Sequence, residues 1–239
     1  MHLSVIIPAY NEEKRLPKTL KEIDKYLKVQ SYDYEIIVVN DGSKDKTGEV
    51  VNRLKPEIKN LKLIDNKINQ GKGAVVKQGM LEAKGDFRIF TDADNSTSLD
   101  QIEKMWPYFN EGYDVVIGSR DAKGAVLDPP QNFFRRFVGD GFRIFRKIIV
   151  GLWNIQDTQC GFKAFTKKAA QTIFPKCKIN RFAFDPEILI IAKQLGFKIK
   201  EIPVYWKNDP DSKVKFKSMI KMASDLFKIR WNMIKNKYD

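Results

Sequence analysis

The first half of this 239-residue chain alternates short apolar runs with amphipathic stretches. The apolar runs are rich in β-branched residues, which favours strands, and the stretches between them repeat apolar residues at helical spacing. This alternation predicts an α/β fold with a mostly parallel sheet, right-handed crossover connections and helices on both faces. Strands are expected at 3–8, 34–40, 61–65, 87–92 and 113–118, and helices at 12–28, 45–54, 72–84 and 98–109.

The pattern changes beyond residue 130. We expect a long helix at about 132–150, a helix near 184–195, a strand at 198–206 and a C-terminal amphipathic helix from about residue 213. A chain of this length can bury one α/β core well and is short for two. The sequence therefore predicts a single domain over residues 1–239.

Polar residues follow four of the predicted strands at the point where each strand ends. "PAYNEE" follows the first strand, "NDGS" the second, "TDAD" the fourth and "GSR" the fifth. In an open α/β sheet, ligands bind outside the carboxyl ends of the strands. These four segments are therefore expected to line one crevice.

Asp92 and Asp94 are separated by a single residue at the end of the fourth strand. Two ionised carboxylates this close repel each other unless a positive charge lies beside them. Mg²⁺ or Mn²⁺ binds one or two carboxylates and completes its shell with waters and substrate phosphates. The alternative is a solvated turn before a helix, because Asn95, Ser96 and Ser98 are capping residues.

Asp41 and Lys72 also occupy positions where a nucleotide could bind. An acidic residue after the second strand can hydrogen-bond a ribose or a base, or it can simply close an Asx-turn. Lys72 lies between two glycines at a predicted helix start, where backbone amides and an ammonium can meet a phosphate. The single histidine, His2, lies at the terminus. Catalysis by an imidazole base is therefore not expected.

The formal net charge of +13 is concentrated in two segments. Residues 133–153 carry 5 − 1 = +4, and residues 213–239 carry 8 − 2 = +6. Such surfaces attract phosphates of nucleic acid, anionic lipid or a charged substrate. The last segment has an apolar stripe that suits either a membrane surface or the sheet. The stripe comprises Phe216, Met219, Ile220, Ala223, Leu226, Phe227, Trp231 and Ile234.

The lengths of the apolar segments and the two cysteines indicate where in the cell the protein is expected. No stretch approaches the roughly 20 apolar residues of a membrane span, and the N-terminal apolar run is far shorter than a signal-peptide core. The two cysteines, Cys160 and Cys177, have no metal-ligand spacing and suit a reducing compartment. We expect a cytoplasmic protein that is soluble or peripheral to a membrane.

Several longer segments resemble family 2 glycosyltransferases of the GT-A fold. They are "VIIPAYNEEKRL", "EIIVVNDGSKDKT", "NQGKGAVVKQGM", "FTDADNST", "VVIGSR" and "DTQCGFKAF". "FAFDPEILIIAKQLGFKIKEIPVYW" and "DSKVKF" resemble the dolichyl-phosphate β-glucosyltransferases, and less closely the dolichyl-phosphate mannose synthases. The resemblance covers nearly the whole chain.

The resemblance implies a site for a nucleotide sugar and a divalent metal, Mg²⁺ or Mn²⁺. Ser96 and Lys207 stand where the mannose synthases tend to have a glutamine and an arginine. Around the base and ribose the resemblance places Pro8, Tyr10, Glu12 and Asp41, at the metal Asp92 and Asp94, and at phosphates near the reacting centre Arg120 and Lys213. Further candidates for binding the donor are Ala9, Lys72, Ala93 and Lys207, and the candidate catalytic residues are Asp94, Arg120 and Asp157.

The implied reaction is an inverting transfer of a hexose, glucose from UDP-glucose, to a polyprenyl phosphate at the cytosolic face of a membrane. Residues 1–120 would bind the nucleotide sugar, and residues 121–239 would form the acceptor half. A phosphate acceptor is already anionic and needs no general base. Alternatives are GDP-mannose as donor, a saccharide hydroxyl as acceptor with Asp157 or Asp185 as base, or a basic nucleic-acid-binding protein. No nucleic-acid-binding module is recognised in the sequence.

Overall fold

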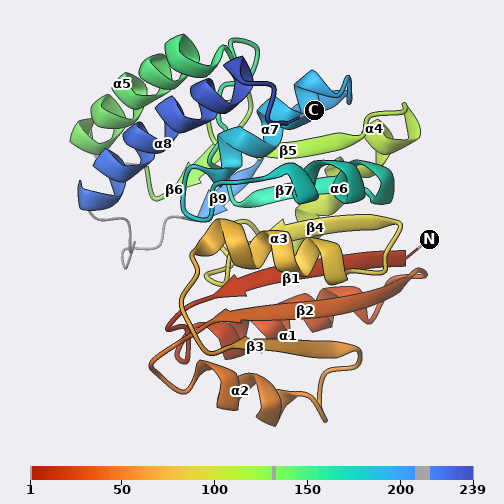
Figure 1. The fold of residues 1–239 in the computed structure, drawn as a ribbon. Helices are drawn as coiled ribbons and strands as arrows, with labels where there is room; N and C mark the ends of the chain where they lie inside the picture. The colour runs from red at the N-terminus through yellow and green to blue at the C-terminus, as the bar shows by residue number, and fades with distance from the viewer. Residues whose placement is uncertain (1, 131–132, 208–215, 239) are drawn as a thin grey trace.

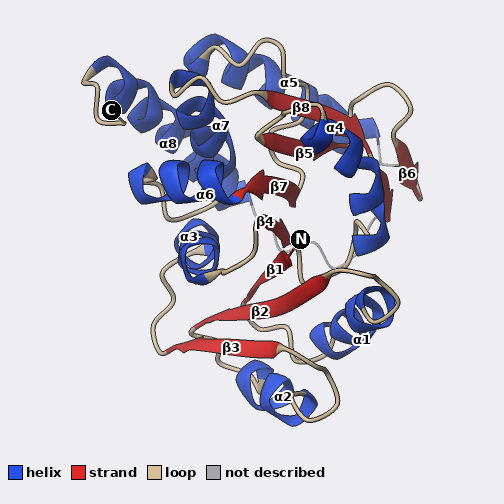
Figure 2. Ribbon diagram, turned by 90° about the vertical axis from the view of Figure 1, so that its right-hand side faces the viewer, coloured by secondary structure: helices blue, strands red, loops and turns tan. Residues whose placement is uncertain are grey.

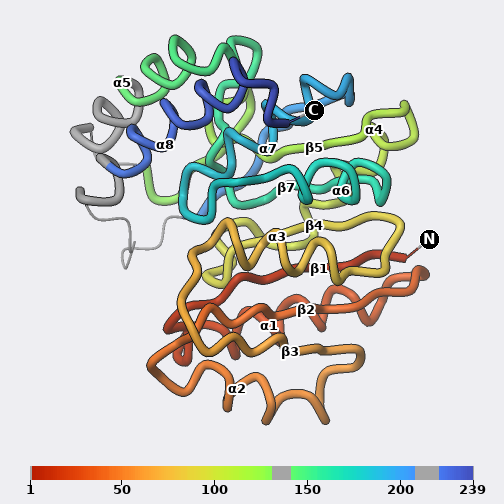
Figure 3. Tube along the Cα trace, in the orientation of Figure 1, coloured from red at the N-terminus to blue at the C-terminus, as the bar shows by residue number. Residues whose placement is uncertain are grey.

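The computed structural model describes residues 2–130, 133–207 and 216–238, and side chains within these ranges outside 133–140 and 216–220. Figure 3 traces the chain through these segments.

A single seven-stranded sheet forms the centre of the molecule (Figure 1). Its strand order is β3-β2-β1-β4-β7-β5-β8. β7 runs antiparallel to β4 and β5, and the other neighbours are parallel, which confirms the predicted mostly parallel sheet. The strands are β1 (His2–Ala9), β2 (Asp33–Asp41), β3 (Leu61–Asn66), β4 (Phe87–Thr91), β5 (Val115–Ser119), β7 (Phe162–Thr166) and β8 (Ile199–Pro203).

Helices cover both faces of the sheet, as Figure 2 shows. One face packs against α3 (Lys72–Glu82), α6 (Lys167–Ile173) and α7 (Phe184–Gln194). The opposite face packs against α1 (Leu16–Leu27), α2 (Thr47–Leu54) and α4 (Trp106–Asn110). Two apolar cores result, one on each side, because the central strands are buried on both faces.

Three predicted elements differ from the structure. The helix expected at 98–109 is a 3-10 helix (Leu99–Lys104) followed by the short α4, which has Pro107 in its first turn. The helix expected from residue 12 begins at Leu16, with Pro17 in its first turn, where proline is favoured, and residues 13–15 form a turn before it. The strand expected at 198–206 is two strands, β8 in the main sheet and β9 (Tyr205–Lys207), which pairs with β6 (Val126–Asp128).

Two long helices, α5 (Phe133–Val150) and α8 (Phe216–Ile234), lie side by side (Figure 1). The rings of Phe145 and Phe227 meet edge to face at 5.8 Å. The stripe predicted on the last helix is partly wrong, because Leu226 is buried whereas Phe227, Trp231 and Ile234 are exposed. Phe216, Met219 and Ile220 lie outside the described side chains. Within the described ranges, none of the helices has the length and apolar character needed to cross a bilayer.

Helix α3 packs close to the sheet because the residue at the contact, Gly79, has no side chain. A Cβ atom at Gly79 would lie 2.5 Å from Cγ2 of Ile6 on β1. We expect Gly79→Ala to lower the free energy of unfolding by about 1–2 kcal/mol, since overpacking outweighs the better helix propensity of alanine. Urea denaturation followed by circular dichroism measures the change.

Gly141 in α5 provides the matched control. No heavy atom lies within 4 Å of the position that its Cβ would take. Gly141→Ala should therefore raise the free energy of unfolding by up to about 1 kcal/mol. Equal effects of the two substitutions would contradict the close packing of α3.

Candidate functional site

The segment after β4 forms a tight turn that presents two carboxylates. The amide of Asn95, which has φ 54°, donates to the carbonyl of Asp92 at 3.2 Å. The amide of Ser96 donates to Oδ1 of Asp94 at 2.9 Å, and Oγ1 of Thr19 donates to the carbonyl of Ala93 at 2.7 Å. Burial, and then the nearby charge of Asp92, raise the pKa of Asp94. A cation between the two carboxylates would offset the repulsion between their charges.

Gly161, just before β7, fixes the position of Asp92. A Cβ atom at residue 161 would overlap with the Asp92 carboxylate, so a side chain there would force that carboxylate to move. The contact exists because β7 pairs with β4, with Phe162 opposite Thr91. Sequence reasoning did not single out Gly161, although it lies within the quoted "DTQCGFKAF" segment.

Lys72, the first residue of α3, lies on the other side of the same carboxylate. Its ammonium pairs with Oδ1 of Asp92, and both side chains are 23% exposed. Burial alone would lower the pKa of Lys72, but the carboxylates of Asp92 and Asp185 raise it. The ammonium therefore stays charged at the place where the two aspartates concentrate negative charge.

Arg120, which follows β5, forms a bidentate ion pair with Asp157. Nε donates to Oδ2 at 2.7 Å, and a terminal nitrogen donates to Oδ1 at 2.9 Å. The guanidinium also lies 4.9 Å from the centre of the Trp206 ring. Asp157 is 4% exposed. Its burial favours the neutral acid, but the Arg120 charge prevails and holds the pKa of Asp157 well below its usual range.

A second buried ion pair joins Lys163 of β7 to Asp185 of α7. The ammonium donates to Oδ1 of Asp185 at 2.6 Å and to the carbonyl of Cys160. Lys163 is fully buried. Sequence reasoning considered Asp185 as a possible base and did not find this partner, because the two residues lie on different elements.

The residues expected around base and ribose lie at the ends of β1 and β2. Pro8 and Ala9 close β1, and Tyr10 follows them. Glu12 forms an ion pair with Arg15 at 2.8 Å. The carboxylate of Asp41 accepts hydrogen bonds from the loop before α3, namely from the amides of Gln70 and Gly71 and the side chain of Asn69. Asp41 thus ties the β2 end to the start of α3.

Lys207 contacts the turn that carries Asp92 and Asp94, here called the aspartate turn, through its backbone. Its amide donates to the carbonyl of Ser96 at 2.7 Å, which places β9 beside the turn, while its side chain is exposed. Ser96 itself is buried. Lys213 lies outside the described residues.

The carboxylate pair is the part of this site that can hold a metal. Among the residues that the structure describes, no group of three or more histidine, cysteine, aspartate or glutamate side chains gathers. A protein-only cage of the calcium type is therefore not supported within these ranges. Two half-buried aspartates fit Mg²⁺ or Mn²⁺, which takes one or two carboxylates and completes its shell with water and phosphate oxygens.

Comparison with known proteins agrees with this geometry. The family model described as glycosyl transferase family 2 matches residues 4–174. The chain is 42% identical to the dolichyl-phosphate beta-glucosyltransferase ALG5A of Trichomonas vaginalis, over 96% of this chain and 73% of that protein. It is 38% identical to the dolichyl-phosphate beta-glucosyltransferase of Dictyostelium discoideum, over 98% of this chain and 75% of that protein.

The fold matches solved structures as well. Glucosyl-3-phosphoglycerate synthase from Mycobacterium tuberculosis, solved with Mn²⁺, UDP and glucosyl-3-phosphoglycerate, superposes with a TM-score of 0.67 at 16% identity, over 95% of this chain and 77% of that chain. At this identity the likeness establishes the fold alone. With the family model over more than half of its length and relatives that align along nearly all of it, the chain belongs to glycosyl transferase family 2 and is a glycosyltransferase of the GT-A fold.

Proposed function

We propose that this enzyme transfers glucose from UDP-glucose to a dolichyl-type polyprenyl phosphate, with inversion at the anomeric carbon. The observation that carries the proposal is the 42% identity, along 96% of the chain, to a dolichyl-phosphate beta-glucosyltransferase. The aspartate turn beside Lys72 adds support, because it lies where an α/β sheet receives its ligands.

The donor half comprises residues 1–120. Residues 8–12 and Asp41 form the wall for base and ribose, and Asp92 and Asp94 would hold Mg²⁺ or Mn²⁺ at the donor diphosphate. Bound there, the metal supplies charge that stabilises the departing nucleoside diphosphate. Lys72 adds a positive charge to the same oxygens, since its ammonium already lies at the Asp92 carboxylate.

The acceptor half comprises residues 121–239, with Arg120 at the boundary. An oxygen of the lipid phosphate attacks C1 of the sugar as the bond from C1 to UDP breaks, so one displacement inverts the configuration. The lipid phosphate and the donor diphosphate are attracted and brought together by the positive charges of Arg120, Lys207 and Lys213. The Trp206 face and the Asp157 carboxylate hold the Arg120 guanidinium in one orientation.

The state of the buried carboxylates favours a phosphate acceptor over a saccharide hydroxyl. A hydroxyl acceptor needs a general base. Both candidates for that base are ion-paired, Asp157 with Arg120 at 2.7 Å and Asp185 with Lys163 at 2.6 Å. A lipid phosphate is already anionic at neutral pH and needs no such base. Asp157 therefore acts by positioning Arg120.

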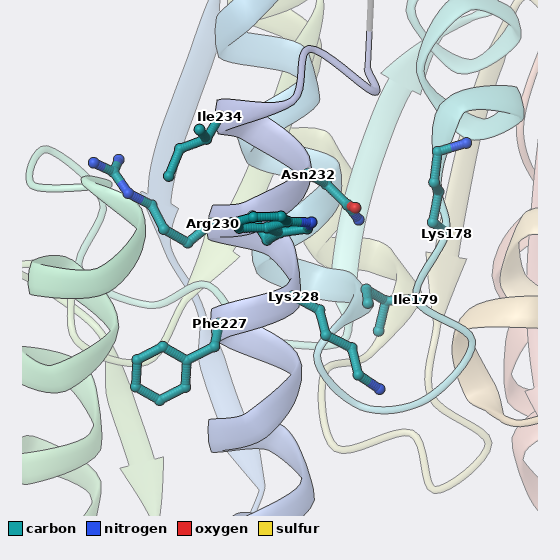
Figure 4. A pocket seen from close by; sticks show the side chains of 8 residues that line it. Lys178, Ile179, Phe227, Lys228, Arg230, Asn232 and Ile234 are labelled. Atoms are coloured by element: carbon teal, nitrogen blue, oxygen red, sulfur yellow. The ribbon is translucent and has the colours of Figure 1, made fainter.

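The enzyme works at the cytosolic face of a membrane, with α5 and α8 as the contacting surface. On α8 a groove of about 650 Å³ has apolar walls from Ile179, Phe227, Trp231 and Ile234. Lys178, Lys228 and Arg230 stand around it (Figure 4). Exposed aromatic and basic side chains on one helix suit the headgroup region of an anionic bilayer.

The same two helices contact the acceptor side of the site. Nε2 of Gln159 donates to the sulfur of Met222 on α8 at 3.2 Å. The guanidinium of Arg146 on α5 donates to the carbonyl of Gln156 at 3.0 Å. Both contacts bear on the segment that carries Asp157. The two helices thus contact the segment that positions Asp157, the partner of Arg120.

The first prediction concerns the aspartate turn. Asp92→Asn and Asp94→Asn should each weaken Mn²⁺-dependent binding of UDP by about a hundredfold or more, because each removes a direct metal ligand. Isothermal calorimetry with and without Mn²⁺ measures the change. Asp100→Asn, at an exposed carboxylate of the same segment, is the control and should bind as the wild type does. Tighter binding of GDP than of UDP would favour the GDP-mannose alternative.

The second prediction concerns the Arg120–Asp157 pair. Asp157→Asn should lower the free energy of unfolding at pH 7 by about 3 kcal/mol, because Arg120 loses a buried partner. Since the pKa of Asp157 is depressed in the folded protein, the unfolded chain takes up the proton first as the pH falls. The stabilisation is complete above the unfolded pKa of about 4 and is lost below it.

Urea denaturation between pH 7 and pH 3 checks this second prediction. The difference between wild type and Asp157→Asn should shrink as the pH falls through about 4 and below. A difference that stays constant over this range would contradict a pairing based on charge.

The third prediction concerns the membrane. The protein should sediment with phosphatidylserine-containing vesicles at low salt, and less at 0.5 M salt, because the Debye length falls to a few ångströms. The double variant Phe227→Ala/Trp231→Ala should sediment less than the wild type at both salt concentrations. Val29→Ala, at an even more exposed apolar residue next to α1, is the control. Equal binding to neutral vesicles would count against the electrostatic part of the proposal.

A further inference from the structure

The ion pair of Lys163 and Asp185 has a cost that the fold does not explain. The Lys163 side chain is 0% exposed and that of Asp185 is 6% exposed. The ammonium also lies 5.3 Å from the centre of the Phe90 ring. Well-packed apolar residues in place of a buried ion pair are often as stabilising or more so. The pair is therefore expected to have a role other than stability.

The location of Asp185 suggests that role. Asp185 lies in the first turn of α7, which packs against the first turn of α3, where Lys72 begins the helix. A Cβ atom at Gly73 would lie 2.6 Å from Cβ of Phe184, and the amide of Ala74 donates to the carbonyl of Asn180 at 3.1 Å. The two helix starts are thus held together by close backbone contacts.

The charge of Asp185 acts on the Lys72 ammonium. Lys72 precedes Gly73 and Asp185 follows Phe184, the two residues at the close contact between the helix starts, so the Asp185 carboxylate lies near the ammonium and helps to keep it charged. Lys72 thus has two carboxylates near it, one in the aspartate turn and one in the first turn of α7. Lys163 holds the Asp185 carboxylate through a 2.6 Å contact and prevents it from turning away.

We propose that Asp185, oriented by Lys163, is a positioning residue that keeps the Lys72 ammonium in the donor site when the nucleotide sugar binds. This inference rests on the proposed function. A divalent cation on the diphosphate competes with Lys72 for Asp92. Without a second carboxylate, a long and flexible lysine side chain would swing to solvent. With Asp185 behind it, the ammonium stays beside the diphosphate.

The test replaces the buried pair by apolar residues of similar size, in the variant Lys163→Met/Asp185→Leu. No lone buried charge remains, so the variant is expected to fold. The probe is UDP with Mn²⁺, and calorimetry gives its dissociation constant. We expect about tenfold weaker binding for this variant than for the wild type. If the variant is not folded, Asp185→Asn, which keeps the side-chain size, takes its place.

A double-mutant cycle with Lys72→Met separates positioning from a structural role. If the pair acts through Lys72, replacing it in the Lys72→Met background should cause no further loss of UDP affinity. A general structural defect would cause the same loss in both backgrounds. Additive losses, or wild-type affinity in the folded Lys163→Met/Asp185→Leu variant, would overturn the inference.

Glu35→Gln serves as the matched control. Glu35 of β2 is buried and ion-paired with Lys62 at 2.6 Å, and its Oε1 also accepts a hydrogen bond from Ser4 of β1. It lies near the amino ends of the strands, away from the aspartate turn. Loss of its charge should change stability and leave UDP affinity unchanged. Failure of the wild-type protein to bind UDP would instead overturn the proposed function, and this inference with it.

Discussion

The site depends on two contacts that hold one carboxylate, that of Asp92, in place. The ammonium of Lys72 pairs with it, and the backbone at Gly161 lies so close that a side chain there would displace the carboxylate. These residues belong to the start of α3, the end of β4 and the segment before β7. Three distant parts of the chain must therefore be placed correctly before the two aspartates can act together on a cation and a diphosphate.

The antiparallel strand β7 makes this arrangement possible. The carboxyl ends of the parallel strands supply Asp41, Asp92 and Arg120 to one edge of the sheet. A strand that runs the opposite way brings its amino end to that edge, so the residues before β7 reach the same edge of the sheet. Asp157 and Gly161 arrive by this route, the first to bind Arg120 and the second to admit Asp92.

What the sequence predicted well is local. Apolar runs with helical stretches between them gave the parallel strands, and strand ends located Asp92, Asp94 and Arg120 correctly at one edge. What it missed depends on pairing over long distances. The "FKAF" stretch of β7 has a lysine at its centre, which suggests a solvated position unless Asp185, 22 residues later, is known to neutralise it. Asp41 likewise bonds a loop 28–30 residues downstream, which no local turn rule foresees.

The charges of the molecule fit a reaction between phosphates. Two buried carboxylates beside the site are paired with cations of the chain, Asp157 with Arg120 and Asp185 with Lys163. On α8, exposed positive charges lie around aromatic side chains at the surface. Buried charges thus hold the site in shape, and exposed charges are left to attract an anionic partner. An acceptor with a negative charge and a long apolar chain can bind both to the cations of the site and to the exposed aromatic and basic side chains of α8. A neutral sugar hydroxyl has neither the charge nor the apolar chain for these contacts.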